Sequence, residues 1–152
     1  MQLPEDSAGI KWITVTSTPA IDGTPGIDKW GNRGFIETLI YMGREWNKEY
    51  PSSPLLINDI SLRDGSTALR GTASHGPAGN EVDILTARTG NRSGRVTWED
   101  PSYNREQTKK IIQLMRKNGF QRIYFNDQII RDSLPYVKAR AGHDDHIHGR
   151  RE

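Results

Sequence analysis

Near its end the chain reads Gly142-His143-Asp144-Asp145-His146-Ile147-His148-Gly149-Arg150, a segment that holds three of its four histidines. Residues two apart on a β-strand point to the same face of a sheet, so a strand over 146–148 presents two imidazoles on one face and Ile147 to a core. His143, three residues earlier across a turn, can fold over the same face. The segment therefore predicts a strand that ends the fold and carries a cluster of imidazoles.

The fourth histidine precedes a second strand-like segment. In Ser74-His75-Gly76-Pro77-Ala78-Gly79-Asn80-Glu81-Val82-Asp83-Ile84, His75 stands in a loop and Asp83 stands between two apolar residues. A carboxylate among buried neighbours is costly unless it meets a cation or accepts hydrogen bonds. Because the chain has no cysteine, a zinc site must use His and carboxylate ligands. We therefore expect Zn²⁺ or a similar divalent ion in tetrahedral His/His/Asp geometry, with one position open to water.

The rest of the sequence predicts a single α+β domain over 1–152, with a small central antiparallel sheet and flanking helices. Residues 1–10 are a candidate flexible end. Apolar residues recur near helical spacing in two segments and alternate or cluster in several short ones. We expect helices over 34–50 and 104–118, a helical turn over 127–134, and strands over 11–16, 55–60, 81–85, 121–125 and 146–148.

The charge balance argues against two classes of partner. Lys and Arg together number 21 and Asp and Glu 19, a net charge of +2 without a dense basic stripe, so nucleic acid is not an expected partner. No segment approaches the roughly 20 apolar residues that span a bilayer, so membrane insertion is not expected either. Residues 1–9 show no signal peptide. The sequence does not indicate the oligomeric state.

The two histidine segments resemble the His-to-Asp and His-x-His signature shared by lysostaphin-type enzymes, D-Ala-D-Ala metallopeptidases and the hedgehog signalling domain. Within this group the chain is most similar to the penicillin-insensitive murein endopeptidases. The matching pieces are Asp59-Ile60-Ser61, Ser74-His75 to Asp83, and the closing Gly-His-Asp-x-His-x-His-x-Arg pattern. The resemblance covers roughly residues 55–150 and implies a D-Ala-D-Ala metallopeptidase/hedgehog-like fold.

Carried over by position, the resemblance implies that His75, Asp83 and His148 are the zinc ligands. In the family the Asp stands one residue closer to the first His, so Glu81 is an alternative ligand. The match of Val82-Asp83-Ile84 to the family's strand favours Asp83.

The resemblance also implies roles for the remaining imidazoles. His146 is expected beside the metal as the group that transfers a proton or stabilises the transition state, and His143 as a further active-site imidazole. Asp144, two residues from His146, is either a carboxylate that orients a histidine or a solvated turn residue. Four loop arginines flank the expected cleft as candidate contacts for substrate carboxylates, although solvation is the better expectation for each: Arg70, Arg88, Arg92 and Arg95.

The function implied by the resemblance is a zinc metallopeptidase, an endopeptidase or carboxypeptidase, that hydrolyses peptidoglycan stem peptides in the periplasm or at the cell wall. Without a visible signal peptide, we expect delivery by a phage, as a secreted antibacterial effector, or after removal of a leader. The alternative is a non-catalytic zinc-containing module that binds the cell wall. A metal phosphohydrolase built on His143-Asp144 is disfavoured because its ligands come from several helices, which this sequence does not predict.

Overall fold

The computed structural model describes residues 1–5, 7–12, 29–60, 79–90 and 92–152. Within these ranges the chain forms one six-stranded sheet and three helices, which confirms the α+β class. The strands are β1 (Ile10–Trp12), β2 (Leu55–Asp59), β3 (Glu81–Leu85), β4 (Phe120–Tyr124), β5 (Val137–Lys138) and β6 (His146–Arg151), and the helices are α1 (Arg33–Glu49), α2 (Arg105–Lys117) and α3 (Gln128–Ser133).

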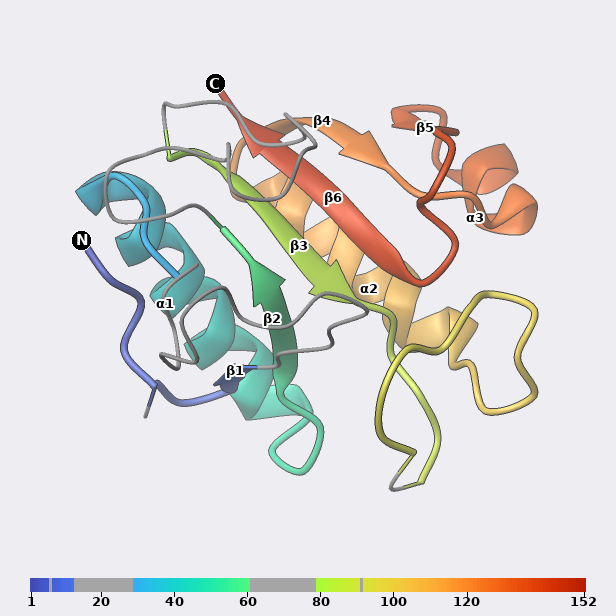
Figure 1. Ribbon diagram of the computed structural model, residues 1–152, viewed down its shortest axis with the longest axis horizontal. Helices are drawn as coiled ribbons and strands as arrows, with labels where there is room; N and C mark the ends of the chain where they lie inside the picture. The colour runs from blue at the N-terminus through green and yellow to red at the C-terminus, as the bar shows by residue number, and fades with distance from the viewer. Residues whose placement is uncertain (6, 13–28, 61–78, 91) are drawn as a thin grey trace.

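The sheet has the strand order β1-β2-β3-β6-β4-β5, so the last strand lies in its centre (Figure 1). The four central strands pair antiparallel, as the sequence predicts, whereas the outer pairs β1–β2 and β4–β5 are parallel. A helix lies between the two strands of each outer pair along the chain, and such a crossover lets the second strand return in the same direction. The sheet is therefore mixed rather than purely antiparallel.

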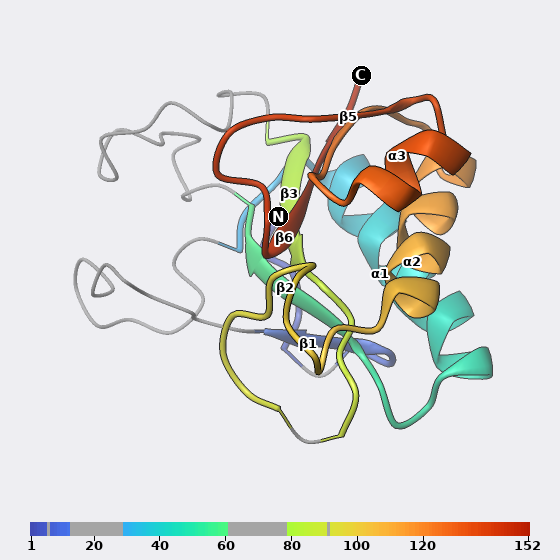
Figure 2. The same cartoon turned by 90° about the vertical axis from the view of Figure 1, so that its right-hand side faces the viewer.

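Helices α1 and α2 lie along the same face of the sheet (Figure 2). Ile84 of β3 and Ile147 of β6 are register partners, and both are fully buried in the core that these helices cover. Because side chains alternate along a strand, their neighbours Asp83 and His148 point to the opposite face. The core thus fixes which face of the sheet receives the polar side chains.

Side-chain caps explain where the two long helices begin. The side chain of Asn32 accepts a hydrogen bond from the Phe35 N–H, and that of Asn104 accepts one from the Gln107 N–H, each satisfying a backbone donor of the first turn. Gly119, with φ of 89°, follows α2 and turns the chain into β4, a conformation that glycine adopts without steric cost.

Several boundaries differ from the expected ones. Strand β6 extends to Arg151 instead of ending at His148, and the two-residue strand β5 was not predicted. At the start of the chain, Leu3 is fully buried and its N–H donates to the Lys29 carbonyl at 2.8 Å.

No helix in the described ranges is long and apolar enough to cross a membrane.

Candidate metal centre

Asp83 and His148 form the centre of a polar cluster on the face of the sheet opposite α1 and α2. They are register partners on the adjacent antiparallel strands β3 and β6. The Nδ1 atom of His148 lies 3.0 Å from Oδ1 of Asp83, and the imidazole is only 3% exposed. The pairing of β3 with β6 therefore brings this carboxylate and this imidazole into direct contact.

His146 lies two residues earlier on β6 and shares that face. Its Nε2 is 3.8 Å from Asp83 Oδ1, and its Nδ1 is 2.7 Å from Oδ1 of Asp145. The other oxygen of Asp145 accepts a hydrogen bond from Arg95 Nη1 at 3.0 Å. An Arg95–Asp145–His146 chain therefore orients the ring so that Nε2 faces Asp83.

The charges around His146 also set its protonation. Burial alone would lower the pKa of His146, but the hydrogen bond with Asp145 and the negative charge of Asp83 outweigh burial and raise the pKa above its ordinary value. Burial likewise opposes ionisation of Asp145, yet its hydrogen bond with His146 and the charge of Arg95 hold the pKa of that carboxyl below its usual range. The two groups stabilise each other's charged forms.

His143 completes a group of three imidazoles. Its ring centroid is 4.7 Å from that of His146 and 5.6 Å from that of His148. Its Nδ1 lies 3.0 Å from the Ala141 carbonyl oxygen, which can only accept, so Nδ1 carries the proton. Burial, assisted by the neighbouring His146, lowers the pKa of His143 and favours its neutral form.

Glu81, the alternative ligand, lies on the far side of His148 from Asp83. Its Oε2 is 3.5 Å from Nε2 of His148, whereas Asp83 faces Nδ1 of the same ring. Its Oε1 is 3.5 Å from Nη1 of Arg150, its register partner on β6. The described geometry therefore places the two carboxylates at opposite nitrogens of the His148 ring, Asp83 at Nδ1 and Glu81 at Nε2.

Two of the described side chains are spaced as ligands of one zinc ion would be. Zinc–ligand bonds of about 2.0–2.1 Å in tetrahedral geometry place two donors roughly 3.3 Å apart. The separation of 3.0 Å between Asp83 Oδ1 and His148 Nδ1 is close to that value. Among the residues that the structure describes, no group of three or more His, Asp or Glu side chains is arranged to hold a metal ion. The predicted third ligand, His75, lies outside the described residues, as does Ser61.

Among the described residues, the Asp144 carboxylate contacts Trp98 and Asn126 rather than one of the two expected partners, a histidine or solvent. Its Oδ1 accepts hydrogen bonds from Trp98 Nε1 at 3.2 Å and from Asn126 Nδ2 at 2.8 Å, and its carbonyl accepts the Trp98 N–H. It therefore ties the loop before β6 to two neighbouring segments. The carboxylate that contacts His146 is Asp145, which the sequence analysis did not identify because it directly precedes the strand and has no periodic signal.

Tyr124 was also missed. It is the β4 register partner of His148, and its ring centroid lies 5.8 Å from that of His148 and 5.9 Å from that of His143. The guanidinium of Arg140 lies 5.1 Å from the centroid of the same ring. The Tyr124 ring therefore packs beside the imidazoles of His143 and His148. Its position follows from the pairing of β4 with β6, which the sequence does not show.

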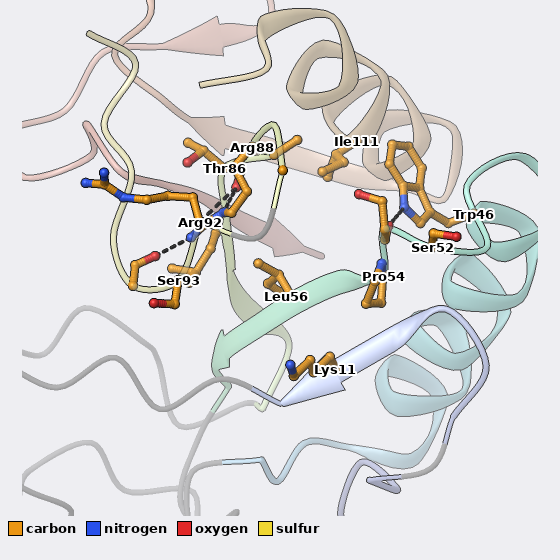
Figure 3. Close-up of a pocket in the computed structure, with 15 residues that line it drawn as sticks. Lys11, Trp46, Ser52, Pro54, Leu56, Thr86, Arg88, Arg92, Ser93 and Ile111 are labelled. Atoms are coloured by element: carbon orange, nitrogen blue, oxygen red, sulfur yellow. Dashed lines mark hydrogen bonds between the residues drawn. The ribbon is translucent and has the colours of Figure 1, made fainter. Parts of the chain in front are cut away.

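The loop arginines have different surroundings. Arg88 and Arg92 line a separate pocket of about 310 Å³, together with Lys11 and Trp46 (Figure 3). Arg88 donates hydrogen bonds to the backbone carbonyls of Thr86 and Gly94, which fix its guanidinium within its own loop. Arg92 pairs with Asp100 at 3.3 Å, and Arg95 belongs to the histidine cluster instead. Arg70 lies outside the described residues.

Compared with known proteins, the chain matches no protein-family model and no curated protein sequence. Its function is therefore inferred from the residues that the fold brings together.

Proposed function

We propose that this protein is a zinc-dependent peptidase that hydrolyses the peptide stems of bacterial peptidoglycan with metal-activated water. The observation that carries the proposal is the convergence of Asp83, His146 and His148, with two imidazole nitrogens at 3.0 and 3.8 Å from one carboxylate oxygen. Asp83, His148 and His75 are the proposed ligands. Bound zinc in such a site lowers the pKa of its water and polarises the scissile carbonyl.

His146 is the proposed proton-transfer group. Asp145 accepts a hydrogen bond from Nδ1, so Nε2 is the nitrogen that faces Asp83 and the proposed substrate side. In its neutral form this ring takes a proton at Nε2, and it then returns that proton to the leaving amine. Asp145 stabilises the imidazolium between these two steps. His143, whose Nδ1 donates to a backbone carbonyl, keeps an unprotonated Nε2 as an additional acceptor.

The choice of peptidoglycan rests on the sequence resemblance, and the choice of catalysis rests on the cluster. A module that only binds needs ligands for its zinc, but it has no need of an imidazole held by an ion-paired carboxylate. The Arg95–Asp145–His146 chain supports the enzyme over the alternative, a zinc-containing module that binds the cell wall. The proposed place of action is the periplasm or the cell wall, reached from a phage, by a secretion system or after removal of a leader.

The experiment that tests the proposal uses purified cross-linked muropeptides, with and without a chelator, analysed by mass spectrometry. We expect release of uncross-linked stems that the chelator stops and added zinc restores. His146→Ala should lose cleavage and keep zinc, while His148→Ala should lose both. Intact dimers together with tight binding to sacculi would favour the binding module instead.

A further inference from the structure

Glu81 is a buried carboxylate with one oxygen directed at the His148 ring. The residue is 5% exposed, and among the described side chains its Oε2 is one of the buried polar atoms without a hydrogen-bond partner. That oxygen lies 3.5 Å from His148 Nε2, the nitrogen on the opposite side of the ring from Asp83. His148 is thus positioned between two carboxylates, one at each ring nitrogen.

The position of Glu81 is fixed by its surroundings. Its backbone pairs with Arg150 across β3 and β6, and Arg150 Nη1 lies 3.5 Å from Oε1. Arg150 is 37% exposed, so this ion pair is partly screened by water and offsets only part of the cost of burying the carboxylate. A hydrogen bond from His148 Nε2–H to Oε2 would satisfy the second oxygen.

We propose that Glu81 is a positioning residue that keeps the proton of His148 on Nε2, so that Nδ1 faces Asp83 with its lone pair free for the metal. This inference rests on the proposed function. Metal-binding histidines commonly donate their other ring N–H to a carboxylate, which fixes both the tautomer and the orientation of the ring. Glu81 therefore acts on the metal through His148 and is not the alternative to Asp83 as a ligand.

The test compares Glu81→Gln, Glu81→Ala and Asp83→Ala with the unchanged protein. The matched control is Glu37→Gln, because Glu37 is an exposed residue of α1 on the other side of the sheet. Zinc affinity is measured by competition with a chromophoric chelator. The proton position on His148 is read from imidazole nitrogen chemical shifts in ¹⁵N-histidine-labelled protein. Circular dichroism checks that each variant is folded.

We expect Glu81→Ala to weaken zinc binding about 10–100-fold, the usual effect of losing a partner of a metal ligand. Glu81→Gln should retain part of this affinity, because its amide oxygen still accepts from Nε2–H. Asp83→Ala should weaken zinc binding far more, and Glu37→Gln should not change it. Zinc-loaded protein should show a protonated Nε2 on His148, and that signal should be lost or exchange-broadened in Glu81→Ala.

Two results would overturn the inference: unchanged affinity and an unchanged His148 spectrum in Glu81→Ala, or loss of zinc in Glu81→Gln as complete as in Asp83→Ala. The second result would make Glu81 a ligand. If the unchanged protein binds no zinc, the proposed function fails separately. In that case the imidazole nitrogen shifts of the metal-free protein test the inference. It requires that His148 carries its proton on Nε2 in the unchanged protein and loses it from Nε2 in Glu81→Ala.

Discussion

Each imidazole of the cluster has its Nδ1 atom next to a different oxygen. The partner is the Ala141 carbonyl for His143, the Asp145 carboxylate for His146 and the Asp83 carboxylate for His148. Burial favours the neutral ring of His143 even though the carbonyl accepts its Nδ1–H, whereas a carboxylate next to a ring nitrogen stabilises an imidazolium or, where both groups bind one metal ion, supplies a second ligand. Three chemically identical side chains are thereby given three different environments within one small surface.

The contact between Asp145 and His146 leads to a pH prediction. In Asp145→Asn the negative charge is removed, so the pKa of His146 should fall, since the hydrogen bond and charge of Asp145, together with the charge of Asp83, raise it against burial. A histidine with a raised pKa stabilises the folded protein below its unfolded-state pKa, and this contribution disappears as pH rises through the folded-state pKa. Because Asp145 must also be ionised, the variant should lose stability mainly at mildly acidic pH, below the pKa of His146 and above that of Asp145.

This prediction is measured by NMR titration of His146 and by urea unfolding at several pH values, with Asp132→Asn as the control. Asp132 is an exposed residue of α3 that accepts a hydrogen bond from Gln128. Peptidase activity should fall about 10–100-fold, as for other groups that orient active-site side chains. An unchanged His146 titration would contradict the role assigned to Asp145.

At the scale of elements, β6 is packed closely against α2. A Cβ atom on Gly149 would overlap the terminal methyl group of Met115 and the ring of Phe120. Gly149 follows His148, so any shift of β6 to relieve that overlap also moves the imidazole. The close packing of one face of the strand thus fixes the position of the residues on the other face.

Gly149→Ala should therefore destabilise the fold by about 1–3 kcal/mol, the usual cost of forcing extra atoms into a packed core. The measurement is the free energy of unfolding in urea. Gly34→Ala is the matched control, because its Cβ would meet only Asn32 Oδ1 at 3.9 Å within the first turn of α1. The control should be neutral or slightly stabilising. Equal effects of the two substitutions would contradict the packing argument.

Asp127 joins α2 and α3 at the side of the sheet that carries β4. It is fully buried, caps α3 through the Ile129 N–H, and accepts hydrogen bonds from Tyr103 Oη and Arg105 Nε, both at 2.7 Å. Its neighbour Asn126 donates hydrogen bonds from its side-chain amide to Asp144 and from its N–H to the His143 carbonyl. Asp127 therefore fixes the position of Asn126, which in turn holds the loop that carries His143.

Asp127→Ala should lower the free energy of unfolding by roughly 2–4 kcal/mol, because it removes a helix cap and the buried acceptor that the half-buried Tyr103 hydroxyl and the Arg105 guanidinium share. Tyr103→Phe, which removes only one of these donors, should cost less. Thermal unfolding of both variants provides the comparison. A smaller loss in Asp127→Ala than in Tyr103→Phe would contradict the anchoring role.

At the scale of the whole molecule, the sequence predicts best what depends on local pattern. The strand over 81–85 has the bounds expected for it, and both long helices agree within a residue at each end, because alternation and helical spacing are visible in the residues themselves. Strand β5 has only two residues, too few for a pattern. The parallel outer pairs depend on how crossovers pack, which is a tertiary property.

For the site, too, the sequence predicts what depends on local pattern and not what depends on how the strands pair. That His146 and His148 share a face follows from period-two alternation and is confirmed, and the pairing of β3 with β6 brings Asp83 to the same face. Which carboxylate meets which ring nitrogen depends on cross-strand register, so the separate positions of Asp145 and Glu81 could not be predicted. Whether His75 joins them remains the prediction on which the metal centre depends.

Metal binding should also alter the stability of the whole domain. A ligand that binds only the folded state stabilises it by about 2.7 kcal/mol at a concentration 100-fold above its Kd. Added zinc should therefore raise the unfolding temperature of chelator-treated protein, as measured by differential scanning calorimetry. His148→Ala should show no such increase. An increase of the same size in that variant would assign the effect to zinc bound elsewhere.

The most direct measurement is the position of zinc by anomalous scattering in crystals grown with the metal. We expect one zinc ion per chain, bonded at about 2.0–2.2 Å to His148 Nδ1, a carboxylate oxygen of Asp83 and a ring nitrogen of His75, with water in the fourth position. A crystal without stoichiometric zinc on this face of the sheet, or with His75 far from His148, would contradict it.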